Sequence, residues 1–176
     1  MASTDLLDVV RDGWTNHQAL IVGALQDLTP EQLGLRTGPE QWTVWQSAGH
    51  IAGARAYWFH DWMGEGDPSV RALFRVASTT VPDLPLEDAG WEDDEAHPRD
   101  AAELVEGLTV TWSVISDCLG RWRPEDLPVE FTKRRPSGSR TVSRGWVIWH
   151  VLEHDLHHAG EISEILGSNG LSPLDM

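Results

Sequence analysis

W-V-I-W-H-V-L-E-H-D-L-H-H-A-G-E-I, residues 146–162, is the segment from which the fold is most directly predicted. It has the apolar spacing of an α-helix, which turns every 3.6 residues. His154 and His158 stand four residues apart in it, so both imidazoles lie on one helix face and can bind one metal ion. This pair predicts a metal site that needs a further donor from another part of the chain.

Half of the chain's eight histidines share that helix face. At about 100° per residue, His150, His154, His157 and His158 fall within an arc of roughly 100°, with Glu161 inside it. These histidines could be a mixture of surface residues and hydrogen-bonded interior residues without a common function. Four histidines on one arc nevertheless favour a metal site. His150 with His154, or His154 with His158, both satisfy the ligand spacing, and His157 can orient a ligand from outside.

The best candidate for the third nitrogen donor is His50. It lies in a second helix-patterned segment, Q-S-A-G-H-I-A-G-A-R-A-Y-W at residues 46–58. Gly49, Gly53 and Ala54 surround it and leave room beside an imidazole for an ion and its ligand, although close helix packing would also use small residues. Three neutral imidazoles leave one coordination position open, as in catalytic rather than purely structural sites.

Apolar residues spaced three and four apart predict four long amphipathic helices. Three of the helices begin at an N-cap residue, namely Thr43, Asp100 or Ser143, and glycine marks their ends. These elements describe an all-α fold, a four-helix bundle, which builds metal sites from side chains on facing helices. The helices are expected at residues 5–28, 43–64, 100–120 and 143–167.

Long crossover connections join the predicted helices. Residues 64–99 are acidic and proline-bearing, and are expected to wrap over the bundle with one short helix near residues 70–76. Residues 123–142 contain Val129 and Phe131 before a P-S-G turn, a pattern that allows a small hairpin before the last helix.

Length and charge narrow the classes of function. The 176 residues fit one compact domain, expected to span residues 1–176. Lys and Arg number 13 against 28 Asp and Glu, a formal charge of −15 that repels phosphate backbones and anionic lipid surfaces. We therefore expect neither nucleic acid nor a membrane as a partner.

A cytoplasmic location is expected from the cysteine usage and from the start of the chain. Cys118 is the only cysteine, which excludes an internal disulfide and suits a reducing compartment. Residues 1–5 have neither a basic region nor a long apolar run, and no run of eighteen apolar residues follows.

The tryptophans and one short motif raise two further interpretations. Ten tryptophans are bulky core filler or, near the histidines, the walls of an aromatic pocket. Residues 150–154 match the H-x-x-E-H pattern of inverted zinc proteases. Only 22 residues follow His154, which leaves little room for a distant carboxylate ligand and argues against a peptidase. The tryptophans flanking the histidine segments are Trp42, Trp45, Trp58, Trp146 and Trp149.

With W-T-V-W-Q-S-A-G-H on the second helix and H-V-L-E-H-D-L-H-H-A-G-E-I on the fourth, the chain resembles the DinB/YfiT-like superfamily of bacterial proteins. That superfamily also includes thiol-dependent S-transferases and mycothiol-dependent maleylpyruvate isomerases. The resemblance implies His50, His154 and His158 as ligands of a divalent ion, often zinc or nickel, and a homodimer. Many relatives carry Arg-Gly-Gln after the last histidine, where this chain has A-G-E at residues 159–161.

The predicted site and the resemblance together imply a metal-dependent thiol S-transferase or a thiol-dependent isomerase. An open position on the ion would bind a small-molecule thiol as thiolate and hold it for attack on an electrophilic substrate. Glu161 or Tyr57 would then move protons. The same site could instead activate water as a hydrolase, or the metal could be a structural staple in a non-catalytic stress or ligand-binding protein.

Overall fold

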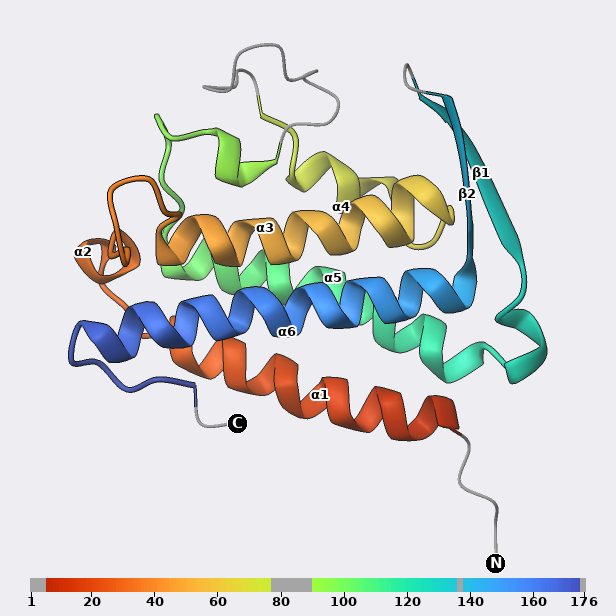
Figure 1. Cartoon of the computed structure of the whole chain (residues 1–176), viewed down its shortest axis with the longest axis horizontal. Helices are drawn as coiled ribbons and strands as arrows, with labels where there is room; N and C mark the ends of the chain where they lie inside the picture. Colours follow the sequence, from red (N-terminus) through yellow and green to blue (C-terminus); the bar gives the residue numbers. More distant parts are fainter. Residues whose placement is uncertain (1–5, 77–89, 136–137, 175–176) are drawn as a thin grey trace, which may run out of the picture.

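Four long helices form the body of the protein, as the sequence predicts (Figure 1). The computed structural model describes residues 6–76, 90–135 and 138–174. Helix α3 packs against α5 and α6, α1 packs against α5, and α3 and α6 run antiparallel (Figure 1). The four helices are α1 (Leu6–Leu25), α3 (Val44–Ala56), α5 (Ala101–Arg121) and α6 (Arg144–Ser168).

Side-chain caps set where the helices begin. Thr43 and Asp100 each form a capping box at the start of α3 and α5, and the Ser143 hydroxyl accepts from the Trp146 amide at the start of α6. Helix α1 ends at Leu25, short of the predicted residue 28, because a new capping box at Thr29 opens α2 (Pro30–Leu33). Helix α3 continues as a π-helical segment, η1 (Tyr57–Trp62).

The crossovers contain short elements. After η1, Gly64 adopts a positive φ of 73°, and the chain turns into α4 (Pro68–Leu73), close to the expected short helix. Residues 77–89 of this crossover lie outside the described residues, and η2 (Trp91–Asp93) follows them. After η3 (Pro124–Asp126), strands β1 (Glu130–Arg135) and β2 (Gly138–Ser143) form the predicted hairpin at the end of the bundle where α6 begins (Figure 1).

Two apolar clusters fill the bundle, one toward each end. One gathers around Ile51 and Leu108, and the other around Trp14 and Ile115, all of which are almost completely buried. Burial of each large apolar side chain contributes about 1.5–3 kcal/mol. Among the described residues, no helix has both the length and the apolar character that crossing a membrane requires. The buried tryptophans of these clusters are Trp14, Trp45, Trp58, Trp62, Trp91 and Trp122.

Candidate metal centre

Three histidines from two helices meet where α3 packs against α6. One ring nitrogen from each of His50, His154 and His158 lies within 4.8 Å of the other two. The Nε2 atoms of His50 and His154 are 2.9 Å apart, and the ring centroids of His154 and His158 are 4.4 Å apart. Bonds of about 2.0–2.1 Å to a tetrahedral ion separate its ligand atoms by roughly 3–4 Å, so this donor set fits one divalent ion.

Burial favours the neutral form of His154 and His158. Burial first, and then the charges of the neighbouring imidazoles, lower the pKa of His154 to about 3. Burial also lowers the pKa of His158. The neutral ring is the form that binds metal ions, so no proton has to leave these two residues first at pH 7. Nδ1 of His154 is buried and has no hydrogen-bond partner within the described part of the chain.

Carboxylates orient two of the three rings. Glu92 Oε1 accepts a hydrogen bond from Nδ1 of His50 at 2.5 Å, and Glu161 Oε2 accepts one from Nδ1 of His158 at 2.7 Å. A carboxylate that accepts a hydrogen bond from one ring nitrogen makes the other nitrogen more basic and fixes its direction, so that it becomes a better metal ligand. The sequence reasoning missed Glu92, whose only signal was its position in the acidic crossover.

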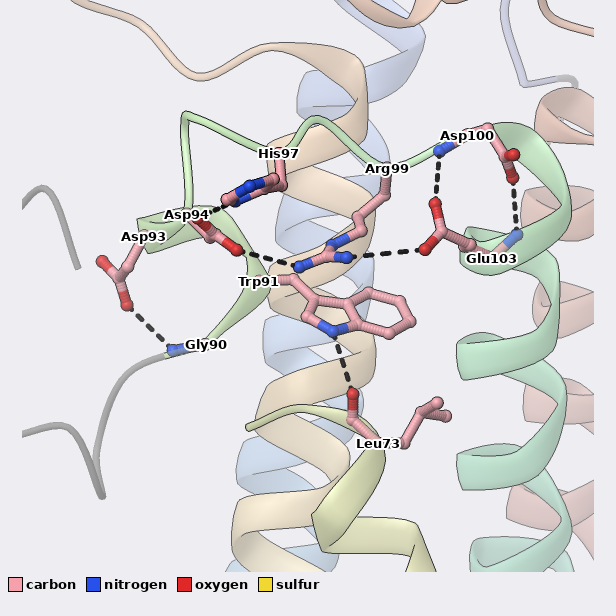
Figure 2. A network of polar contacts seen from close by, with 9 residues as sticks. All are labelled: Leu73, Gly90, Trp91, Asp93, Asp94, His97, Arg99, Asp100 and Glu103. Carbon is pink, nitrogen blue, oxygen red and sulfur yellow. Dashed lines mark hydrogen bonds and ion pairs between the residues drawn. The ribbon is translucent and has the colours of Figure 1, made fainter. Parts of the chain in front are cut away.

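Trp91, the residue before Glu92 in the chain, is fixed by its indole (Figure 2). Its indole is buried, and Nε1 donates to the carbonyl oxygen of Leu73 at 3.0 Å. A Cβ atom added at Gly49 would lie 3.2 Å from the Trp91 Cβ, and one at Gly107 would lie 2.9 Å from its Cζ3. Gly49 therefore makes room for this indole, and not for an ion as the sequence analysis expected.

Ion pairs tie the segment around Glu92 to the start of α5 (Figure 2). Arg99 donates to Asp94 at 3.1 Å and to Glu103 at 3.4 Å. From the other side, the Gln46 side chain of α3 donates to the carbonyl oxygen of Glu92 at 3.0 Å. The carboxylate that contacts His50 is thus anchored to both α3 and α5.

A completely buried ion pair lies directly beside the imidazoles. Arg55 donates from Nε to Asp155 Oδ2 at 2.8 Å, and neither side chain is exposed. The indole Nε1 of Trp14 donates to the same oxygen at 2.7 Å, and Arg55 also donates to Gln18 Oε1 at 2.7 Å. This network fixes α6 against α3 and α1, because Asp155 comes from α6 and its partners come from the other two helices. Since Asp155 follows His154 in the chain, the network also fixes the position of that imidazole. The sequence analysis did not identify it.

The imidazole cluster separates two clefts. The first, which we name the aromatic cleft, has a volume of about 330 Å³ and contains His50, His154 and the predicted proton carrier Tyr57. His150 also lines it, with its ring stacked on Trp146 at 4.5 Å, and lies outside the group of three nitrogens. The other lining residues are Gly53, Ala54, Trp58, Arg71, Gly90 and Glu92.

The second, which we name the acidic cleft, lies on the His158 side and has a volume of about 350 Å³. Glu161, the other predicted proton carrier, lines it and pairs with His157 at 3.2 Å as well as with His158. Tyr57 and Glu161 therefore occupy different clefts. The other lining residues are Thr37, Glu40, Gln41, Trp42, Ser47, Glu164 and Ile165.

Known structures share this architecture. A DinB-like protein from Bacillus cereus is 18% identical, with a TM-score of 0.63 over 95% of both chains. A conserved protein from Enterococcus faecalis is 12% identical, with a TM-score of 0.68 over 94% of this chain and 99% of that one. A candidate member of the DinB family from Exiguobacterium sibiricum is 19% identical, with a TM-score of 0.51 over 92% of both chains. At these identities the likeness shows the fold alone.

The sequence itself identifies the family. No curated protein matches the chain. The sequence model of the DinB superfamily, in contrast, matches residues 14–162, which include α3, α5, the hairpin and all three clustered histidines. With both the sequence pattern and the fold in agreement, the chain belongs to the DinB superfamily.

Proposed function

We propose that the protein is a metal-dependent thiol S-transferase or thiol-dependent isomerase, with His50, His154 and His158 as the ligands of one zinc or nickel ion. The observation that carries the proposal is the cluster of three imidazoles at the wall between two clefts. Three protein ligands leave a position for a fourth, which is typical of catalytic ions. Imidazole suits both metals, so the ligand set does not choose between them.

The two clefts supply what such a reaction needs. A divalent ion held here would lower the pKa of a small-molecule thiol bound to it. Glu161 beside His158 can accept the proton that the thiol loses, because its carboxylate lines the acidic cleft. Tyr57 and Trp58 line the aromatic cleft and can hold an apolar electrophile, and in this proposal the Tyr57 phenol protonates it after attack.

We also propose that the protein is a homodimer paired through bundle helices. The support is that four large apolar side chains on α1 and α6 are exposed to solvent, where a partner subunit would bury them. Leu6 is 72% exposed, Val9 55%, Trp149 65% and Leu156 45%.

A conjugation assay on metal-loaded protein tests the proposed reaction. Purified protein, loaded with one equivalent of zinc or nickel, is incubated with a panel of small thiols and a generic electrophile, and the conjugate is measured by mass spectrometry. We expect conjugation that His50→Ala abolishes. His60→Ala is the matched control, because His60 lies outside the cluster and contacts the carbonyl oxygen of Glu65.

Other outcomes would select a different function on the same site. Cleavage of esters or amides without conjugation of any thiol would identify a hydrolase, since the same ion can activate water. Stoichiometric metal with no turnover, and a melting temperature that falls in His50→Ala, would identify a structural staple in a non-catalytic binding protein.

A further inference from the structure

The acidic cleft carries groups that the proposed reaction does not use. We propose that this cleft binds the ammonium group of a small thiol, so that the protein selects amine-bearing thiols over neutral and anionic ones. The proposal rests on the proposed function, because it names the class of thiol that the metal site takes.

Charge is the first support. Glu40, Glu161 and Glu164 line the acidic cleft, and no lysine or arginine is among its lining residues. Glu161 is engaged by His157 and His158. Glu40 and Glu164 form no ion pair with any residue in the described ranges, so their negative charge stays uncompensated beside the cluster. The aromatic cleft differs, because Arg71 lines it.

An unpartnered hydroxyl is the second, independent support. Ser47 lines the acidic cleft, and its side chain is only 1% exposed. Its Oγ atom is buried and has no hydrogen-bond partner among the residues that the structure describes. Buried polar groups in folded proteins are nearly always satisfied, so this hydroxyl indicates a ligand donor or acceptor. Ser47 lies one helical turn before His50 on α3, which puts this ligand group next to the metal site.

The cleft wall favours an organic cation over a second metal ion. Trp42 is 37% exposed, and its ring centroid lies 4.6 Å from that of His50 and 5.7 Å from that of His158. An indole face attracts an ammonium group through its π-electrons but is not a metal ligand. A volume of about 350 Å³ also suits a small molecule better than a single ion.

Three thiols of similar size test the proposal directly. Cysteamine, 2-mercaptoethanol and mercaptoacetate carry a positive, a neutral and a negative group, and their Kd values for zinc-loaded protein are measured by calorimetry. We expect cysteamine to bind roughly 10-fold more tightly than 2-mercaptoethanol, because the two solvent-exposed carboxylates of Glu40 and Glu164 contribute up to about 5-fold each. Mercaptoacetate should bind most weakly, and added salt should reduce the differences.

Variants of the cleft locate the effect. In Glu40→Gln/Glu164→Gln, and separately in Ser47→Ala, the affinity for cysteamine should fall roughly 3- to 10-fold while that for 2-mercaptoethanol stays nearly constant. Glu106→Gln is the matched control, since Glu106 is an exposed carboxylate on α5 that lines neither cleft.

Several results would overturn the proposal. Equal affinity for the three thiols would do so, as would a preference for cysteamine that survives in the double variant. A second equivalent of zinc that is lost in the double variant would show that the cleft is a metal site instead. Ethanolamine, which has the ammonium group but no thiol, separates this inference from the reaction: its binding supports the ammonium site even where no thiol is conjugated.

Discussion

Successive residues of α6 belong to two polar clusters of opposite character. Asp155 is completely buried and, with Arg55, Trp14 and Gln18, belongs to a network of short hydrogen bonds. His154 belongs to a cluster of imidazoles whose other members are partly exposed, with side-chain exposures of 26% for His50 and 12% for His158.

The two clusters have different tasks. The ion pair has its charges paired inside the bundle and joins three helices, so it determines how α6 lies against α3. The imidazoles use this placement but keep binding capacity, since one nitrogen from each ring converges on the same point. If the tasks are divided in this way, the loss of stability and the loss of metal affinity should follow from changes at different residues.

Breaking the ion pair should produce the largest change. Asp155→Ala leaves the Arg55 charge buried without its partner, so the free energy of unfolding should fall by about 3–5 kcal/mol. Chemical denaturation of metal-free protein measures this value. Asp117→Ala, at an exposed position on α5, should change it by less than about 0.5 kcal/mol. A loss below about 1 kcal/mol in Asp155→Ala would contradict the structural role of the pair.

Removing an imidazole should act on metal affinity and not on the fold. We expect His154→Ala to weaken zinc binding by more than about 100-fold. Loss of a hydrogen-bond partner of a ligand already lowers metal affinity by about 10- to 100-fold, and loss of the ligand itself should lower it more. Competition with a chromogenic chelator measures the affinity. The unfolding free energy of metal-free His154→Ala should stay within about 1 kcal/mol of wild type, and a larger fall would remove the contrast with Asp155.

The carboxylate behind His50 should have an intermediate effect. Glu92→Gln keeps a side chain of the same shape but removes the carboxylate charge that lies beside Nδ1 of His50, so zinc affinity should fall about 10- to 100-fold. Glu95→Gln, at an exposed position of the same crossover, is the control. Equal zinc affinity in the two variants would show that Glu92 does not orient the ring.

Acid should destabilise the metal-free protein through its imidazoles. Burial lowers the pKa of His17, His150, His154 and His158, so below the ordinary pKa of about 6.5 the unfolded chain binds more protons than the folded protein. Stability is therefore retained above that pH and decreases as pH falls. His154 alone should contribute a loss of about 1.4 kcal/mol at pH 5.5. Unfolding free energies at pH 7.5 and 5.5 that do not differ would refute the neutral cluster.

The sequence predicted what depends on local patterns. N-caps at Thr43, Asp100 and Ser143 gave the helix starts, and the four-residue spacing put His154 beside His158. Local patterns do not predict which residues from distant segments pair with each other. Glu92 lies 42 residues from His50 and Asp155 lies 100 residues from Arg55, and only the packed fold brings these partners together. The π-helical segment was also missed, since its sequence continues the apolar pattern of α3.

Glu92 comes from a crossover and not from the helices that supply the imidazoles. The helices that bring the imidazoles together and the carboxylate that tunes one of them are therefore separable parts. Replacing Glu92 alone, with Trp91 and Arg99 kept, would change the charge beside the His50 ring while the buried contacts of this crossover remain intact. Metal preference would then become a trait that travels with one crossover side chain, open to evolution or to design without change to the interior.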